Sequence, residues 1–363
     1  MAEAPSASTR PHTSSTTTDA PEGGANILGD RRPRARGRHK GRRWLVQLGA
    51  YFATICALIT INFLVPRMMP GNPVQALAAK GSTTFTFGQQ GQVALERYYG
   101  LDRSLVSQFG HYLSQLAHGD LGWSIVTNAP VGDDLARRMP WTLLLIGTSL
   151  LLATALGLVA GVHSGWRRGR ALDRGLLTVL LSVREFPTFL LGSLLLLLFA
   201  VKLGWLPISG AETAFSSLGP GGSILDIGRH LLLPALVLSV GLTAGSFLIM
   251  RAGMVNELGA DYLLWGRAKG LRERRLKYNY AARNALLPVV SLTALQLGFV
   301  VTGDVLIERI FSYPGVGNLI FESINSRDYP AIQGAFLFVA VSVITVNALA
   351  DVFYRRLDPR TSS

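Results

Sequence analysis

The feature that most constrains this chain is the clustering of its apolar residues into six long stretches. A helix that crosses a bilayer needs about 20 predominantly apolar residues. Six stretches meet this requirement: Trp44–Val65, Trp141–Val162, Gly175–Ala200, Leu231–Met250, Ala285–Ile307 and Gly334–Tyr354. Charged residues make up only 16% of the chain, against roughly 25% in soluble domains. The sequence therefore predicts an all-α integral membrane protein with six transmembrane helices.

Basic residues alternate between the segments that connect the six stretches. The basic segments are Arg31–Arg43, Arg167–Arg174, Arg251–Arg283 and a C-terminal group of Arg355, Arg356 and Arg360. Because Lys and Arg are enriched in cytoplasmic loops, this alternation predicts a multi-pass protein of the plasma membrane with both termini in the cytoplasm. Topology and contact with anionic lipid of the bilayer account for the net charge of +13. We therefore expect no nucleic-acid partner.

Composition divides the chain into four parts. Residues 1–43 are rich first in Ser, Thr, Ala and Pro and then in Arg, which predicts a disordered, basic cytoplasmic tail. Residues 44–138 contain the first span and an extracytoplasmic region, where apolar spacing predicts a packed helix over Leu105–His118. Residues 139–354 contain the other five spans and the loop 251–284. Residues 355–363 form a cytoplasmic C-terminal tail.

No motif for catalysis occurs in the chain. The patterns G-x-x-x-x-G-K-[S/T], H-E-x-x-H and G-x-S-x-G are absent from the sequence. Cys56 is the only cysteine, and His111 and His118 stand two helical turns apart without a third ligand. We therefore expect no catalytic residue, no metal site and no cofactor in this chain. If the chain performs work, the energy must come from a partner protein or from an ion gradient.

Charged residues within the apolar stretches are the candidates for a translocation path. Arg184, Glu185 and Pro187 lie near the middle of the third stretch, where a charge is costly and proline kinks a helix. Asp304 and Glu308 end the fifth stretch, four residues apart on one expected helix face. Two roles stay open: an ion pair between Arg184 and one of these acids, or the handling of substrate.

The loop Ala260–Pro288 is longer than a connection between two spans requires. Its basic residues are Arg267, Lys269, Arg272, Arg274, Arg275, Lys277 and Arg283, and its acidic residues are Asp261 and Glu273. It also contains helix-forming residues and a glycine at position 270. This composition predicts a cytoplasmic helix-turn element that another protein binds.

Short motifs of proline, glycine and aromatic residues punctuate the chain. In order, they are Pro70-Gly71-Asn72-Pro73, Gly119-Asp120-Leu121-Gly122, Pro187-x-Phe189-x-x-Gly192, Leu203-Gly204-Trp205-Leu206-Pro207, Phe311-Ser312-x-Pro314-Gly315-x-Gly317 and Arg327-Asp328-Tyr329-Pro330. With them, the chain resembles the permease subunits of dipeptide/oligopeptide-type ABC importers from the first span to the C-terminus. The resemblance implies the type I ABC importer permease fold. It also implies three kinds of partner: a sister permease, two ATP-binding subunits and an extracytoplasmic substrate-binding protein.

The resemblance further implies that the loop 251–284 carries a coupling helix that docks on an ATP-binding subunit. The matching residues are Gly266, Arg267, Ala268, Lys269, Gly270 and Leu271. Trp265 and Gly266 depart from the family pattern, in which threonine and alanine are usual. Glycine lowers helix propensity by about 1 kcal/mol relative to alanine. We therefore expect either a docking helix that begins later or a Trp265 side chain that fills the ATPase groove.

Three functions are compatible with these observations. The resemblance implies ATP-driven import of peptides or a related small solute. The alternative is a secondary carrier driven by an ion gradient, with Glu308, Asp304, Arg184 and Glu185 as the ion site. A membrane scaffold is the third. Arg184, Glu185 and Asp304 also depart from the family pattern, so the cargo stays open among dipeptides, oligopeptides, nickel chelates, haem and sugar–peptide conjugates.

Overall fold

The structure is a computed structural model that describes residues 38–69, 93, 97, 102–214, 219–297 and 304–357. The chain divides into two compact units, residues 1–53 and residues 54–363. Of the first unit, the structure describes only the beginning of helix α1 (Arg38–Met68). The predicted disorder of residues 1–37 and the motif at residues 70–73 lie outside the described residues. All the features below belong to the second unit.

Two long helices, α5 (Val131–Trp166) and α8 (Pro220–Glu257), form the most extensive helix–helix contact of the described chain. Both are long and apolar enough to cross a membrane, which confirms the second and fourth predicted spans. Gly157, Gly161 and Gly165 recur every fourth residue on the face of α5 that packs on α8. Because glycine has no Cβ, the two backbones come close together.

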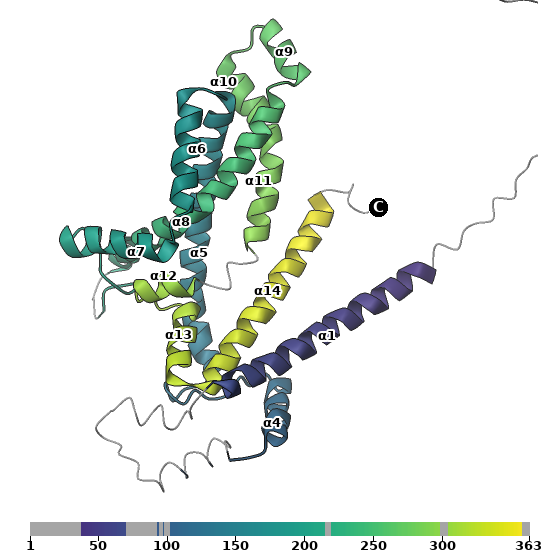
Figure 1. Cartoon of the computed structure of the whole chain (residues 1–363), viewed down its shortest axis with the longest axis vertical. Coiled ribbons are helices and arrows are strands. Elements are labelled where there is room, and N and C mark those ends of the chain that lie inside the picture. The colour runs from purple at the N-terminus through teal and green to yellow at the C-terminus, as the bar shows by residue number, and fades with distance from the viewer. Residues whose placement is uncertain are drawn as a thin grey trace, which may run out of the picture. The chain divides into compact units, whose positions relative to one another are not determined.

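Shorter helices surround this pair (Figure 1). They are α4 (Leu105–Ala117), α6 (Ala171–Arg184), α7 (Thr188–Leu195) with its π-helical continuation Leu196–Lys202, α9 (Asp261–Ala268), α10 (Glu273–Arg275) with its π-helical continuation Leu276–Ala281, α11 (Ala282–Leu297), α12 (Val305–Ile310), α13 (Val316–Ser326) and α14 (Tyr329–Leu357). The predicted all-α fold is thereby confirmed.

The third predicted span, expected as one kinked helix, is not continuous. It consists of α6 and α7 with its π-helical continuation, and the two parts are bent by 95°. Pro187 lacks a backbone N–H and cannot continue α6, so it stands as the N-cap of α7. Arg184 and Glu185 therefore lie exposed at a corner rather than in the middle of a membrane helix.

The remaining predicted spans are described in part. The apolar portions of α1 and α14 within the described residues, Ala53–Met68 and Tyr329–Thr345, are shorter than a full crossing. Helix α11 is described to Leu297, and α12 begins at Val305 as a separate helix with Asp304 as its N-cap. The expectation that Asp304 lies on the same helix face as Glu308 is therefore wrong, because Asp304 precedes the helix.

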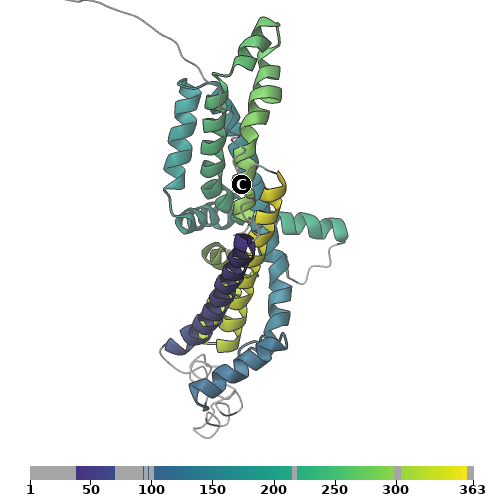
Figure 2. The ribbon, with the colours of Figure 1, turned by 90° about the vertical axis from the view of Figure 1, so that its right-hand side faces the viewer.

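The predicted helix over Leu105–His118 is confirmed as α4. It packs on the end of α1: the ring centroids of Phe63 and Phe109 are 5.0 Å apart, and those of Phe63 and Tyr112 are 5.8 Å apart. The ends of α1 and α14 also meet there, where the Asn62 side-chain amide donates to the Gln333 carbonyl oxygen at 2.8 Å (Figures 1 and 2).

Candidate functional site

Helix α9 lies in the first part of the basic loop Ala260–Pro288, and Gly270 follows its C-cap. Gly270 has a φ of +74°, in the left-handed region. Its N–H donates to the Arg267 carbonyl oxygen at 2.9 Å, and the Leu271 N–H donates to the Gly266 carbonyl oxygen at 3.1 Å. These two hydrogen bonds form the helix-ending Schellman motif, which requires a left-handed residue at this position. Lys269 stands as the C-cap.

The two faces of α9 differ sharply in exposure. Leu263 is buried, and Gly266 packs so closely that a Cβ built on it would lie 2.5 Å from the Leu276 Cδ2. Leu264 and Trp265 are 67% and 66% exposed. The alternative that the docking helix begins later is wrong, because α9 begins at Asp261. Close packing on Leu276 explains this glycine, and the low helix propensity of glycine does not prevent the helix.

Polar contacts tie α9 to its neighbours. The Tyr262 hydroxyl donates to the Glu257 carboxylate at the end of α8, and the Asn284 amide reaches the same carboxylate at 3.4 Å. Burial, and then the neighbouring Glu257 carboxylate, raise the pKa of Tyr262 to about 12. Arg267 Nε donates to Glu273 Oε1 at 3.0 Å. Helix α9 is thus connected to α8, to α10 and to the start of α11.

The glycine stripe of α5, formed by Gly157, Gly161 and Gly165, is a site feature that was not predicted from the sequence. A Cβ on Gly157 would lie 2.6 Å from the Ser246 Cβ, and one on Gly165 would lie 2.5 Å from the Met254 Cβ. The signal was available as a repeated G-x-x-x-G within an apolar stretch, which is typical of close helix packing in membranes. The stripe fixes the distance between α5 and α8, and α8 leads into α9.

An ion pair lies near the C-terminal ends of α5 and α8. Arg251 of α8 donates through Nε and Nη2 to the two carboxylate oxygens of Asp173, at 2.7 and 2.9 Å. The Ser164 hydroxyl donates to this carboxylate at 2.5 Å and the Gly169 N–H at 2.8 Å. Asp173 is buried, and the Arg251 guanidinium holds its pKa well below the usual range of a carboxyl. One acid therefore joins α5, α6 and α8.

The candidates for a translocation path do not form one cluster. Arg184 and Glu185 are exposed at the corner between α6 and α7. The Asp304 carboxylate accepts from the Ile307 N–H at 3.1 Å, as an N-cap does. Within the described residues, Arg184 forms no ion pair with Asp304 or with Glu308. No group of His, Cys, Asp or Glu suitable for a metal ion occurs among the described residues.

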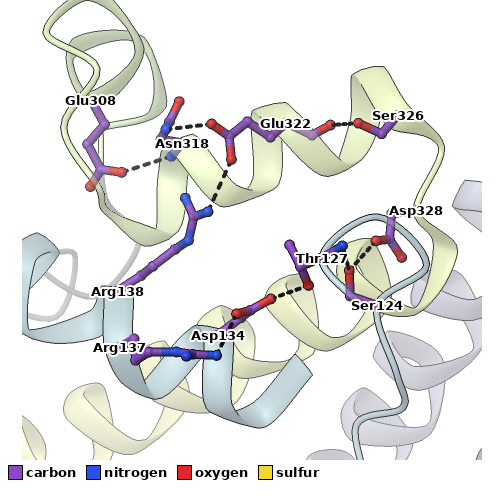
Figure 3. A network of polar contacts seen from close by, with 10 residues as sticks. All are labelled: Ser124, Thr127, Asp134, Arg137, Arg138, Glu308, Asn318, Glu322, Ser326 and Asp328. Carbon is purple, nitrogen blue, oxygen red and sulfur yellow. Dashed lines mark hydrogen bonds and ion pairs between the residues drawn. The ribbon is translucent and has the colours of Figure 1, made fainter. Parts of the chain in front are cut away.

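Glu308 lies in α12, and its side chain is fully buried beside the start of α13 (Figure 3). Its carboxylate accepts from the Thr142 hydroxyl at 2.8 Å and from the Asn318 N–H at 2.9 Å. The Thr142 oxygen in turn accepts from the Val316 N–H at 2.8 Å. Gly317 lies so close that a Cβ there would be 2.9 Å from a carboxylate oxygen. These contacts hold the Pro-Gly-x-Gly segment, Pro314 to Gly317, against the Glu308 side chain.

A second buried acid connects two distant motifs (Figure 3). The Asp328 carboxylate accepts from the Ser124 hydroxyl at 2.5 Å and from the Val126 N–H at 3.1 Å. Gly122 contacts the same region, because a Cβ there would lie 3.3 Å from the Pro330 Cβ. The Gly-Asp-Leu-Gly and Arg-Asp-Tyr-Pro motifs therefore pack on each other and hold the starts of α5 and α14 together.

Comparisons with known proteins agree with this architecture. Residues 153–363 match the family described as the inner membrane component of binding-protein-dependent transport systems. The di/tripeptide transport system permease protein DppB of Pseudomonas aeruginosa is 37% identical over 328 residues, which cover 86% of this chain and 96% of the relative. The glutathione transport system permease protein GsiC of Escherichia coli K12 is 35% identical over 306 residues, which cover 84% of this chain and 94% of the relative.

Proposed function

The chain belongs to the family of inner membrane components of binding-protein-dependent transport systems and is a permease component of an ABC importer; we propose that it imports peptides or a related small solute. The di/tripeptide and glutathione permeases among its relatives support this substrate class. In the proposed complex, a sister permease completes the path. An extracytoplasmic substrate-binding protein delivers the solute.

Two ATP-binding subunits supply the energy in this proposal, because the chain itself contains no phosphate-binding loop. The basic segments at residues 167–174 and 251–283 face the cytoplasm, as the positive-inside rule requires. Both termini lie on that side as well. The ion-gradient alternative gains no support, because neither relative is named as such a carrier and the structure does not join Arg184 to Asp304 or Glu308.

The observation that carries the coupling role is the pair of exposed apolar side chains on a firmly supported helix. Leu264 and Trp265 project from α9 while Leu263 and Gly266 pack against the loop beneath. An amphipathic helix of this kind fits a groove of a partner. Lys269 follows the apolar pair, is exposed and is available for an acidic side chain of the ATP-binding subunit, whereas Arg267 is paired with Glu273.

The connections of α9 suggest how movement reaches the spans. A displacement of α9 acts on α8 through the Tyr262–Glu257 hydrogen bond and the short connection between the helices. A movement of α8 also moves α5, because the two helices are in direct contact along the glycine stripe. ATP binding then shifts the helix bundle from one arrangement to the other, because the ATP-bound subunits contact one arrangement more favourably.

Site-directed crosslinking tests the docking of α9. Cys56 is the only cysteine, so Cys56→Ser gives a cysteine-free background in which Trp265→Cys is combined with a cysteine in the groove of the ATP-binding subunit. We expect a crosslink whose yield changes with ATP. Leu105→Cys, exposed on α4, is the matched control. Equal yields at positions 265 and 105 would refute the docking role.

A further inference from the structure

A basic cavity of about 700 Å³ lies between the segment that follows α5 and the loop that carries α9 and α10. Its charged lining residues are Arg167, Arg170, Arg267, Glu273, Arg274 and Lys277. Glu273 is already paired with Arg267, at 3.0 Å. The other four cations have no carboxylate partner among the described residues. The fold therefore gathers like charges from two separate loops into one space.

Lys277 is the clearest sign that this cavity receives an anion. Lys277 belongs to the π-helical segment after α10, and the residue as a whole is only 8% exposed. The Nζ lies 4.9 Å from the centroid of the Tyr278 ring. No carboxylate and no hydrogen-bond acceptor of the described chain contacts it. Neighbouring like charges without a counter-charge repel one another, so an external anion that fills the cavity would stabilise the loop.

The other lining residues indicate which anion fits. Trp166 and Tyr278 contribute aromatic rings, and Leu258 contributes an apolar side chain. Trp166 ends α5, four residues beyond the predicted membrane stretch Trp141–Val162. Aromatic and basic residues at the end of a membrane helix are typical of the headgroup region of the bilayer. A free phosphate ion would use the cations but would leave the aromatic and apolar walls without a partner.

We propose that this basic cavity binds the phosphate headgroup of an anionic phospholipid. The headgroup lies between Arg167 and Arg170 on one wall and Arg274 and Lys277 on the other. Since the second wall belongs to the loop that carries α9, a bound lipid holds this loop against the end of α5. The proposal concerns the lipid surroundings of the permease and is independent of the transported solute.

Thermal unfolding of the purified importer complex in a neutral detergent tests the proposal. Phosphatidylglycerol, phosphatidylcholine or inorganic phosphate is added at matched concentration. We expect phosphatidylglycerol to raise the Tm at least threefold more than either of the others. An equal rise with phosphatidylcholine would overturn the anion site, and an equal rise with inorganic phosphate would overturn the lipid assignment.

Charge-removing variants locate the site. Arg167→Gln with Arg170→Gln removes two exposed cations of the cavity wall, and Arg168→Gln with Arg174→Gln removes two exposed neighbours outside the lining. We expect the first pair to reduce the phosphatidylglycerol shift at least threefold and the second pair to leave it unchanged. Equal reductions would show diffuse attraction to the bilayer and overturn the proposal.

Lys277 provides a second, independent variant. Lys277→Gln removes the positive charge of this cavity-lining residue, whereas Lys277→Arg keeps it. We expect the glutamine variant to be less responsive to phosphatidylglycerol and the arginine variant to respond as the unmodified complex does. In native mass spectrometry, the unmodified complex should retain about one phosphatidylglycerol molecule. The Arg167→Gln, Arg170→Gln variant should release it. Retention of that lipid by the variant would contradict the assignment.

Discussion

Gly161 of α5 and Met250 of α8 touch across the main helix interface of the described chain. A Cβ built on Gly161 would lie 2.6 Å from the Met250 Cβ and 2.9 Å from the Phe247 carbonyl oxygen. Any side chain at this position must push the helices apart. Because α8 continues toward α9, this contact also determines where α9 stands relative to α5.

Replacing Gly161 with alanine should destabilise the protein. The added methyl group forces the close-packed interface open, and overpacking of this kind costs about 1–3 kcal/mol. We expect a lower Tm and a smaller fraction of monodisperse protein in detergent. Gly147→Ala is the matched control, because it lies in the same helix and its Cβ would meet nothing within 4 Å. Equal effects of the two substitutions would contradict the close contact.

The Asp173–Arg251 pair predicts a pH-dependent contribution to stability. The arginine lowers the pKa of Asp173 in the folded protein, so the ionised carboxylate stabilises the fold at every pH above the ordinary carboxyl pKa of about 3.9. This contribution is lost as the pH falls below that value toward the folded pKa. Asp173→Asn should therefore lower the Tm at pH 7 and pH 5 by the same amount, and by less at pH 3.5.

Asp133→Asn provides the control for this pH series. Asp133 is exposed near the start of α5, so its loss should leave the Tm nearly unchanged at each pH. A Tm difference between Asp173→Asn and the unmodified protein that stays constant down to pH 3.5 would show that the carboxylate is not ionised in the pair.

Local patterns in the sequence predicted the helical class, the two long spans and the position of α4. They failed at the third stretch, because apolar composition does not distinguish a continuous helix from one that turns by 95° at Pro187. They also misplaced Asp304, because the sequence pattern alone does not distinguish an acid within a helix from one that caps the helix. Its hydrogen bond to the Ile307 N–H identifies it as a cap.

The candidate site was predictable in position but not in construction. The basic loop and the segment Gly266–Leu271 were evident from charge and from family resemblance. The reason for Gly266 was not, because it depends on Leu276, ten positions later in the chain. The basic cavity likewise depends on the approach of residues 167–170 to residues 267–278. Such contacts between distant segments have no local signal.

Gly270→Ala should weaken the end of α9. A non-glycine residue at a φ of +74° costs about 1 kcal/mol, which loosens the Schellman turn and the orientation of the helix. We expect slower uptake per ATP hydrolysed in reconstituted importer, with normal membrane insertion. Gly270→Asn should restore part of the coupling because asparagine tolerates the left-handed region. Gly259→Ala, at a position without positive φ or close neighbours, should have no effect.

Glu308→Gln separates a structural role of this acid from a role in handling substrate. The glutamine side chain presents one NH₂ group where the carboxylate now accepts from Thr142 and from the Asn318 N–H. With the glutamine oxygen toward the Asn318 N–H and its NH₂ group toward Thr142, the buried Thr142 O–H loses its acceptor, which costs about 1–3 kcal/mol. Because Glu308 is fully buried, we expect a lower Tm and an equal proportional loss of uptake for cationic, neutral and anionic peptides. Glu322→Gln, on a half-exposed partner of Arg138 and Asn318, should lower the Tm less. A loss confined to cationic peptides, with an unchanged Tm, would instead place the Glu308 carboxylate in the path of the solute.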